Sequence, residues 1–561
     1  MHPMEGAHMD EDRFDIAISG GGPFGLMLAN ELGRRGIRTI LFDEKPSTAF
    51  NPQANATQAR TMEHYRRLGF AEEIRALGLP VDFPTDIAYF TRYARHELAR
   101  FRLPSAREAR ERVASLKGSW SAAELPHRVS QKFVEQVLRR HAEALDDVSV
   151  DYGWRVVDFA DDGDGVTVTA EAVEGAARRS VRCAWFVAGD GARSFVRRRL
   201  GINYAGDAGA ERDFFGGRMF ALYLSCPQFY DIVPFPPAWM NVTFNADRRA
   251  FMAAVDGRGE FAFHTQLRDG EDEAEIDDAR ALEMFRAAVG APVDAKILSR
   301  GTWMAGYALV AERFGKGRVL LGGDAVHLFT PAGGLGYNTA VDDAVNLGWK
   351  LAAVIKGVAA SALLDSYEAE RRPAAIRNTG FARGFAESLG LFVPKPGLED
   401  STPEGNVSRA EAGDYLAAHG KAEFNIPGIT FGVRYEASPV ILAEPGLRGE
   451  DRPDVYVPTA APGGRAPHAW LDETTSLFDR FGFEWTLLRL GVEPPEGAAL
   501  VAAAAEVGMD LTVVEIASDD VLDLYKAPLV LVRPDQVVAW RGTDDTEAAK
   551  VVATVLGRGP S

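Results

Sequence analysis

The sequence predicts an α/β protein with a discontinuous parallel-sheet domain, an antiparallel sheet inserted into it, and a smaller α/β domain at the C-terminal end. A strand, a glycine turn, a helix and a second strand follow one another at residues 14–44, which is typical of a βαβ unit. Residues 205–300 instead alternate polar and apolar positions, as in WMNVTF and FAFHTQL, which indicates antiparallel strands. Strand–loop–helix patterning returns at residues 318–357, so we expect the chain to re-enter the first domain there.

Length, charge and cysteine content narrow the class of protein. A chain of 561 residues is too long for one hydrophobic core, so two or three domains are expected. The formal net charge of −18 disfavours nucleic acid and anionic membranes as partners. Two cysteines, Cys183 and Cys226, are too few for a disulfide framework or a cysteine metal cluster, which favours the cytoplasm and predicts no metal site. The acidic N-terminal stretch lacks the apolar segment of a signal peptide, and we predict no membrane span.

The order of elements suggests where the domains begin and end. FDIAISG (14–20) is predicted to be a buried strand, PFGLMLANELGRR (23–35) a helix, and IRTILFDE (37–44) the next strand. Asp-Gly pairs predict hairpins within residues 148–173. We assign a nucleotide-binding domain to residues 12–80, 115–205 and 300–395, an inserted sheet domain for the substrate to 81–114 and 206–299, a linker or helical connection to 396–435, and a last α/β domain to 436–561.

The turn after the first strand has the pattern Gly20-x-Gly22-x-x-Gly25, with Pro23 at the start of the helix. Gly20 permits the tight turn, Gly22 lets the backbone approach a pyrophosphate, and Gly25 lets the helix pack closely on the strand. The helix N-terminus adds free N–H groups and a positive dipole. Because the pattern lies between a predicted strand and a predicted helix, dinucleotide binding is favoured over a turn that needs glycine for its own sake.

Acidic residues at strand ends extend this site. Asp43 ends the second strand, where such folds place the acid that binds a ribose, and the adjacent Glu44 is the alternative. A second strand-to-helix junction, CAWFVAGDGARSFVRRRLG, carries Asp190. A third junction, RVLLGGDAVHLFTPAGGLGYNTAVDDAVNLGWKLA, carries Gly323 and Asp324. Three such junctions in one chain suggest that all of them contact one extended ligand.

In this order and at these separations, the glycine loop, the DG sequence and the GD sequence resemble the fingerprints of the class A FAD-dependent monooxygenases, the aromatic-ring hydroxylases. The resemblance covers most of residues 12–375, and DAVH, PAGG, GYN and DAVNLGWKLA are its most specific stretches. It implies a Rossmann-type FAD-binding domain of the glutathione-reductase kind. The GD acid of the family binds the ribityl chain of FAD, a role that falls to Asp324, and the glycines of PAGGLG let backbone lie against the isoalloxazine.

The resemblance also implies a set of cofactor-binding residues. ARTMEHYRRLG is similar to the family segment whose arginine, here Arg60, lies near the cofactor. PHRVSQKFVEQVL is similar to the helix whose glutamine, here Gln131, contacts FAD. The predicted FAD-binding residues are Gly20, Gly22, Pro23, Gly25, Asp43, Glu44, Arg60, Gln131, Asp190, Gly323, Asp324, Pro331, Gly334, Leu335, Gly336 and Asn338.

The C-terminal part resembles a domain found in one branch of this family. PGGRAPHAWL, SLFDRFG and LVRPDQVVAWRG are similar to stretches of the thioredoxin-like domain of the phenol-hydroxylase branch. The domain has no Cys-x-x-Cys here, which excludes thiol redox chemistry. We expect it to serve packing or a dimer contact, with a homodimer as the default assembly.

The resemblance implies hydroxylation of a small aromatic substrate, phenolic or heteroaromatic, with O2 and NAD(P)H through a C4a-hydroperoxyflavin. A second dinucleotide-binding unit is not predicted, so NADPH or NADH would be a transient co-substrate. The halogenases that share this fold have a W-x-W-x-I-P signature that is absent here. An FAD- or ligand-binding protein without turnover is the other alternative, and NAD(P)H consumption with O2 would discriminate it from an enzyme.

The sequence defines the chemistry of the substrate pocket less well. Phenol-hydroxylase relatives often have an aspartate at the position of Asn55; an amide cannot act as a base, so either another base exists or the substrate needs none. Tyr223 and His264 are the other catalytic candidates, and a hydrogen-bonded structural histidine would explain His264 equally well. Strand alternation predicts that the residues facing the substrate are Met219, Trp239, Asn241, Thr243 and Gln266, together with Pro331.

Overall fold

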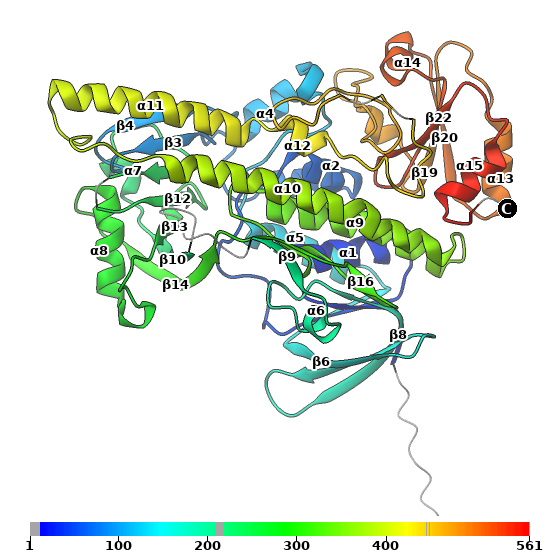
Figure 1. The fold of residues 1–561 in the computed structure, drawn as a ribbon, viewed down its shortest axis with the longest axis horizontal. Coiled ribbons are helices and arrows are strands. Elements are labelled where there is room, and N and C mark those ends of the chain that lie inside the picture. The colour runs from blue at the N-terminus through cyan, green and yellow to red at the C-terminus, as the bar shows by residue number, and fades with distance from the viewer. Residues whose placement is uncertain (1–11, 208–216, 246, 445, 448, 560–561) are drawn as a thin grey trace, which may run out of the picture.

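The computed structural model describes residues 12–207, 217–245, 247–444, 446–447 and 449–559 (Figure 1). The N-terminal stretch on which the signal-peptide prediction rests lies outside the described residues, as do residues 208–216 of the predicted sheet domain. Two large sheets and a smaller C-terminal sheet, with hydrophobic cores packed against them, organise the described part of the chain.

The first large sheet carries the parallel strands that the glycine pattern predicts. Within the described residues its order is β16-β17-β8-β1-β2-β5, with the hairpin β6–β7 attached to β8. Its strands are β1 (Asp12–Ser19), β2 (Thr39–Asp43), β5 (Val148–Tyr152), β6 (Trp154–Asp161), β7 (Val166–Ala172), β8 (Arg178–Ala188), β16 (Gly315–Lys316) and β17 (Val319–Leu321). The central strands are parallel and largely buried on both faces, which explains the apolar run at residues 16–18 within FDIAISG.

Helices cover this sheet and connect its strands. Helix α1 (Pro23–Gly33) joins β1 to β2 and packs against α5 (Gln131–Glu143) and α9 (Leu335–Ile355). Pro23 occupies the first helical position, where its missing N–H costs nothing, and Gly22 is the N-cap. The chain returns to this sheet at β17 after about 130 residues elsewhere, which confirms the predicted α/β class with an inserted sheet.

The second large sheet combines two distant segments of the chain. Its order is β14-β10-β13-β12-β11-β3-β4 within the described residues. Its strands are β3 (Ile87–Phe90), β4 (Glu97–Phe101), β10 (Gly217–Ser225), β11 (Met240–Thr243), β12 (Ala250–Ala254), β13 (Glu260–Gln266) and β14 (Lys296–Ala305). All pairs are antiparallel except β3 with β11. The predicted boundary at residue 300 is wrong, because it cuts β14, whose pairing with β10 continues to Ala305.

Two long helices pack against each other, and the second of them lies over β3 and β4 (Figure 1). They are α10 (Asp365–Leu391) and α11 (Pro403–Phe424), and α11 begins where the Thr402 side chain accepts a hydrogen bond from the Gly405 N–H. Leu416 of α11 is fully buried in the core of the second sheet. The segment 396–435, predicted as a linker or helical connection, is therefore an integral layer over β3 and β4.

The C-terminal domain has a mixed sheet of order β20-β19-β21-β22 within the described residues. Its elements are β19 (Trp485–Leu490), α13 (Ala498–Glu506), β20 (Leu511–Ile516), α14 (Asp519–Tyr525), β21 (Leu529–Val532), β22 (Val538–Gly542) and α15 (Ala548–Val555). One parallel and two antiparallel pairs flanked by helices agree with the predicted thioredoxin-like fold. Trp485 packs edge-on against Trp349 of α9 at 5.5 Å, which joins this domain to the first one.

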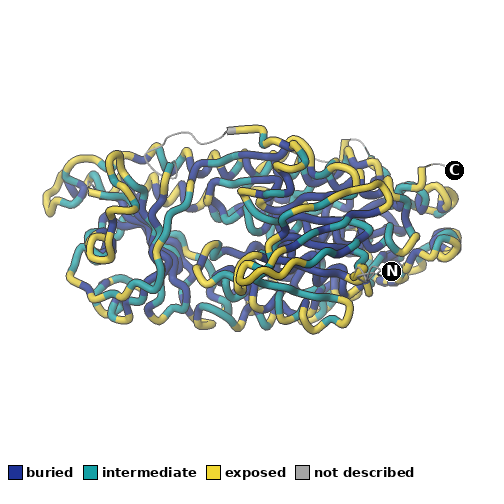
Figure 2. The backbone as a smooth tube through the Cα atoms, turned by 90° about the horizontal axis from the view of Figure 1, so that it is seen from below, coloured by how far each residue is buried: buried dark blue, intermediate teal, exposed yellow. Residues whose placement is uncertain are grey.

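Shorter elements connect these layers. They are α2 (Ala59–Arg67), α3 (Ala71–Arg75), α4 (Ala106–Arg112), α6 (Phe195–Arg199), α7 (Phe229–Ile232), α8 (Asp278–Val289), α12 (Pro427–Phe431) and a small sheet of β9 (Tyr204–Asp207), β15 (Ala308–Ala311) and β18 (His327–Leu328). Figure 2 shows that buried backbone follows the sheets and the helices between them, whereas exposed backbone lies at the loops. Among the described helices, none combines the length and the apolarity that crossing a membrane requires.

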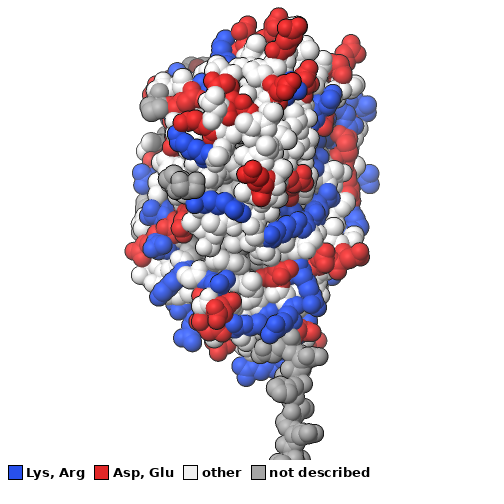
Figure 3. Space-filling model, turned by 90° about the vertical axis from the view of Figure 1, so that its right-hand side faces the viewer, with Lys and Arg blue, Asp and Glu red and all other residues white. Residues whose placement is uncertain are grey.

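Charges of both signs are interspersed on the face shown in Figure 3. The whole chain has 80 acidic and 62 basic residues, so acidic side chains are in excess. That face offers no continuous basic strip of the kind that binds a phosphate backbone.

Candidate active site

A cavity of about 1480 Å³ lies between the carboxyl ends of the parallel strands and one face of the antiparallel sheet. Its volume exceeds the roughly 300–1,000 Å³ of a pocket for one drug-sized ligand, so it has room for a cofactor and a substrate. Sixteen predicted site residues line it: Gly20, Gly22, Pro23, Asp43, Glu44, Asn55, Gln131, Asp190, Tyr223, Trp239, His264, Asp324, Pro331, Gly334, Leu335 and Gly336.

The three glycines of the first loop have different reasons to be glycine. Gly20 has φ 107°, and a Cβ there would lie 2.3 Å from the carbonyl oxygen of Gly189. At Gly25, which does not line the cavity, a Cβ would lie 1.9 Å from the carbonyl oxygen of Gly20. Gly22 has φ −84°, and a Cβ there would meet nothing within 4 Å. Neither backbone strain nor packing requires glycine at Gly22, which leaves close approach of a ligand as the reason.

Gly22→Val therefore separates folding from cofactor binding. We expect the variant to fold with a melting temperature near that of the wild type, because the new side chain enters open space. We expect its FAD affinity to fall by about tenfold or more, a cost of roughly 1.4 kcal/mol or above. Flavin absorbance per purified protein measures the loss, and Gly25→Val is the contrast because its side chain would collide with backbone. Normal FAD content in folded Gly22→Val would show that the loop is not the phosphate site.

Asp43 is bound to backbone at the end of β2. Its carboxylate accepts hydrogen bonds from the N–H of Gly21 at 2.5 Å and of Lys45 at 2.8 Å. Glu44 instead pairs with Arg155 at 2.7 Å on the surface. Asp43 is thus rigidly held beside the glycine loop, and the prediction that prefers it to Glu44 for the ribose is consistent with this geometry.

Two carboxylates approach the cavity without full hydrogen bonding. Asp190 accepts one bond from the Val196 N–H at 3.1 Å, and its Oδ1 is buried with no partner among the described residues. Asp324 faces the cavity, and among the described residues no group donates a hydrogen bond to its carboxylate. Desolvation within the cavity raises the pKa of both carboxyl groups. Both acids can accept hydrogen bonds from ligand hydroxyls.

Asp343 of α9 supports the loop that carries Asp324. It accepts hydrogen bonds from the Gly323 N–H at 3.2 Å, from His327 Nε2 at 2.6 Å and from Arg371 Nε at 2.7 Å. Gly323 itself lies behind the cavity wall. The network is fully buried, so the position of Asp324 is fixed by α9 and α10 together.

The N-terminus of α9 faces the cavity without a side-chain cap. Gly334 is its N-cap with φ 63°, and a Cβ there would lie 2.9 Å from that of Ala56. Asn338 does not line the cavity: it accepts hydrogen bonds from the Gln58 N–H and the Thr61 hydroxyl, and donates one to the Ala56 carbonyl. Asn338 thus ties the cavity wall to the helix, and the uncapped N–H groups can stabilise negative charge.

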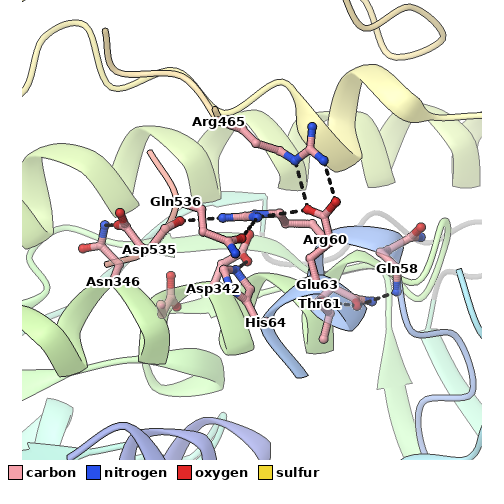
Figure 4. Close-up of polar contacts among 12 residues, drawn as sticks. Gln58, Arg60, Thr61, Glu63, His64, Asp342, Asn346, Arg465, Asp535 and Gln536 are labelled. Atoms are coloured by element: carbon pink, nitrogen blue, oxygen red, sulfur yellow. Dashed lines mark hydrogen bonds and ion pairs between the residues drawn. The ribbon is translucent and has the colours of Figure 1, made fainter. Parts of the chain in front are cut away.

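Arg60 lies away from the cavity, which contradicts the prediction for it. It pairs with Glu63 at 3.0 Å and donates to the side chain of Gln536 at 2.6 Å and to the carbonyl of Asp535 at 2.5 Å (Figure 4). The C-terminal domain meets α2 through these contacts, and Arg465 adds a buried ion pair with Glu63. A partner more than 470 residues away cannot be seen in the local pattern ARTMEHYRRLG.

The substrate side of the cavity is the face of the second sheet that carries Tyr223 and His264. The predictions for Asn241 and Thr243 are wrong, because Met240 and Val242 line the cavity and their neighbours point to the opposite, buried face. Both faces of β11 are buried, so the alternation offers no polar contrast from which to choose a face. Trp239 does line the cavity, as predicted. It precedes β11, so its direction does not show which face of that strand its alternate residues occupy.

Met219 and Gln266 also lie outside the cavity lining. They are paired with each other across β10 and β13, one row further along the sheet than the pair Ala221 and His264. The alternation therefore identifies the face of these strands correctly but does not show where the cavity ends.

The catalytic candidates differ in what their polar atoms can do. Tyr223 donates its hydroxyl proton to Glu260 and accepts a hydrogen bond from Lys132 at 2.9 Å. Burial, with Glu260 beside it, raises the pKa of Tyr223, so it stays protonated. Asn55 donates to the Gln53 carbonyl at 3.1 Å, and its buried Oδ1 has no partner among the described residues. Neither side chain is suited to act as a base, although Asn55 can accept a hydrogen bond from a substrate.

The cofactor half of the cavity fits FAD. Open space at Gly22, uncapped helix N-termini at α1 and α9, and acceptors without full hydrogen bonding at Asp190 and Asp324 match a ligand with phosphates and a hydroxylated chain. A profile described as "FAD binding domain" matches residues 13–382, and one described as "Aromatic-ring hydroxylase, C-terminal" matches residues 459–559. The chain belongs to the family of FAD-dependent aromatic-ring monooxygenases.

Individual proteins are similar to this monooxygenase over most of their length. "FAD-dependent monooxygenase apdD" of Emericella nidulans is 30% identical over 97% of this chain and 90% of that protein. "4-Methyl-5-nitrocatechol 5-monooxygenase" of a Burkholderia species is 30% identical over 95% of each. The structure of the enzyme RebC soaked with chromopyrrolic acid, with bound 7-carboxy-K252c, superposes with a TM-score of 0.87 at 32% identity, covering 98% of this chain and 99% of that one.

This monooxygenase therefore binds FAD and hydroxylates an aromatic substrate, as the sequence predicts. Sequence reasoning missed Glu423 of α11, which lines the cavity, accepts a hydrogen bond from the Gly333 N–H at 2.9 Å and binds His419 at 2.8 Å. The sequence signal for this pair is the i,i+4 spacing of His419 and Glu423, which lie in the segment predicted as a linker or helical connection. Phe251 and Trp303 were missed too, because their roles depend on neighbouring strands.

Proposed function

We propose that this monooxygenase hydroxylates a phenolic or heteroaromatic ring with O2 and NAD(P)H. The observation that carries the proposal is one continuous cavity, in which the FAD-binding loops face an apolar and aromatic sheet surface. Bound FAD, once reduced, would supply the activated oxygen. The protein would orient the ring on the sheet and exclude water from it.

The residues of the cofactor half would divide the work of holding FAD. The α1 N-terminus and Gly22 would receive the pyrophosphate, Asp43 the ribose, and Asp324 the ribityl chain. The α9 N-terminus would face the flavin ring and stabilise negative charge on it. A single glycine-loop sheet occurs within the described residues, which supports NADPH or NADH as a transient co-substrate rather than a second bound dinucleotide.

Consumption of NAD(P)H, followed at 340 nm over a panel of phenols and N-heteroaromatics, tests the proposal. We expect a compound that binds the cavity to accelerate oxidation of the nicotinamide and to gain the mass of one oxygen atom, which 18O2 would label. The protein with Gly22→Val is the matched control, because it should fold and lack the cofactor. A flavin-containing protein that no ring compound stimulates would favour the alternative of a binding protein without turnover. The homodimer and the cytoplasmic location stay predictions.

A further inference from the structure

His264 stands on the cavity face of β13, in a row of residues that crosses the sheet. Phe251 on β12 is paired opposite it on one side, and Ala221 on β10 on the other. The row ends at Gly301 on β14, which is paired with Ala221. A Cβ at Gly301 would meet nothing within 4 Å, and its backbone is not left-handed, so neither packing nor conformation requires glycine there. Because Ala221 and Gly301 have small side chains or none, they leave open space in the cavity beside the imidazole.

Two aromatic neighbours fix the orientation of the His264 ring. Phe251 stacks on it with ring centroids 4.6 Å apart and planes 13° from parallel. The indole of Trp303, on β14, donates a hydrogen bond from Nε1 to His264 Nδ1 at 3.1 Å. Trp303 reaches His264 across β10, where Ala221 has only a methyl group. Rotating the ring by 180° would set a C–H against the indole N–H and lose this bond.

The hydrogen bond from Trp303 determines where the imidazole carries its proton. An indole N–H can only donate, so Nδ1 of His264 must be the acceptor. Burial lowers the pKa of His264 to about 4, so the ring is neutral near pH 7. A neutral ring with an unprotonated Nδ1 has its proton on Nε2. Nε2 is the ring nitrogen farther from the backbone, and the His264 side chain lines the cavity. Among the described residues, Nε2 has no hydrogen-bond partner.

We propose that His264 is a substrate-binding hydrogen-bond donor whose Nε2–H selects aromatic rings that present an acceptor oxygen, either a ring carbonyl or a phenolate, above Ala221 and Gly301. The inference rests on the proposed function of the cavity and narrows its substrate class. His264 is then not the base that removes a phenolic proton, because Nε2 already carries a proton and Nδ1 is occupied. Trp303 is a positioning residue that acts through the tautomer of His264.

The tautomer can be measured without substrate or turnover. Long-range 1H–15N correlation spectra of the FAD-loaded protein with 15N-labelled histidine distinguish a protonated ring nitrogen from an unprotonated one, and His264→Gln identifies the signal. We expect Nε2 protonated and Nδ1 unprotonated in the wild type. Trp303→Phe keeps an aromatic ring but removes the donor, so it should give a mixture of tautomers. A wild-type ring protonated at Nδ1 or at both nitrogens would overturn the proposal.

Binding to the oxidised protein tests the recognition itself. His264→Gln retains an N–H near the position of Nε2, whereas His264→Phe retains a ring and loses the donor. For 1,4-naphthoquinone and the 4-nitrophenolate ion, we expect His264→Phe to lower affinity by about tenfold and His264→Gln to restore most of it. Affinity for 4-nitroanisole, which offers no phenolate, should be nearly equal in all three proteins.

The two oxygen-bearing probes separate the sources of the acceptor. A histidine-dependent response to the quinone alone assigns a carbonyl, and a response to nitrophenolate alone assigns a phenolate. The proposal would be overturned if His264→Phe lowered affinity for 4-nitroanisole as much as for the other two probes. It would also be overturned if neither 1,4-naphthoquinone nor 4-nitrophenolate bound to the wild type. Failure of the proposed function would appear elsewhere, as absent NAD(P)H oxidation or oxygen incorporation, because neither the spectra nor these affinities require turnover.

Discussion

Asp324→Ala yields a folded protein that purifies with little or no flavin. The carboxylate faces the cavity, and among the described residues it has no hydrogen-bond donor of its own, so its binding capacity is available to the cofactor. A hydrogen bond to a charged acceptor contributes roughly 1.5–3 kcal/mol, which corresponds to about a ten- to hundredfold loss of FAD affinity. Flavin absorbance of the purified protein and titration of the apoprotein with FAD measure the effect.

The stability of the Asp324→Ala apoprotein separates a binding role from a structural one. The Asp324 side chain is exposed to the cavity and, among the described residues, has no hydrogen-bond donor, so it holds no other part of the protein in place. Replacing it should leave the melting temperature of the apoprotein near that of the wild type. Asp82→Ala, at an exposed ion pair with Arg107, is the control for loss of an acid. An Asp324→Ala protein that retains a full complement of FAD would contradict the assignment.

Arg465→Met is expected to produce the largest loss of stability. Arg465 and Glu63 form an ion pair with no exposed side-chain surface, and this pair joins the C-terminal domain to α2 (Figure 4). Removing one partner of a buried pair costs roughly 3–5 kcal/mol because the other charge stays buried. Arg60 still lies 3.0 Å from Glu63, so the lower end of this range is expected. Denaturant unfolding of the FAD-loaded protein measures the change.

A double variant and a surface variant control this prediction. Arg465→Met with Glu63→Leu removes the unpaired carboxylate and should recover part of the lost stability, but not all of it, because Arg60 then loses its own pair with Glu63. Arg107→Met breaks an exposed pair with Asp82 and should cost less than about 1 kcal/mol. If Arg465→Met unfolded with the same denaturant midpoint as the wild type, the ion pair would not hold the domains together.

The same ion pair predicts how stability depends on pH. Arg465 and Arg60 outweigh the effect of burial and lower the pKa of Glu63 to about 2, from 4.5 in the unfolded chain. The unfolded state therefore binds the proton first, and the contribution of Glu63 is complete above about pH 4.5 and is lost as the pH falls toward 2. Arg465→Met should weaken this acid dependence, which unfolding curves between pH 5 and 3 would show.

The sequence indicates the position of a residue best where a backbone conformation or a strand end by itself sets that position. Gly20, Gly22 and Gly25 follow one strand and begin one helix, so their separate tasks follow from local geometry. Asp190 and Asp324 lie where strands end, and the carboxyl ends of parallel strands meet at one edge of the sheet. The placement of such residues depends on local backbone structure and not on contacts with distant parts of the chain.

Predictions fail where the neighbour that decides is distant in sequence. Arg60 belongs to the interface with Gln536, and α11 is a layer over β3 and β4 rather than a connection. Asn241 and Thr243 face away from the cavity. The sequence does not reveal this direction, because both faces of β11 are buried and alternate residues therefore show no polar contrast.

The sequence by itself determined the FAD-binding class, the inserted sheet and the C-terminal domain, because strand, turn and helix signals are local and recur in a fixed order. The tertiary structure decided which side chains reach the cavity, and it decided the protonation of His264, which depends on Trp303 two strands away. The physical reason is that hydrogen bonds and burial act between surfaces that only folding brings together.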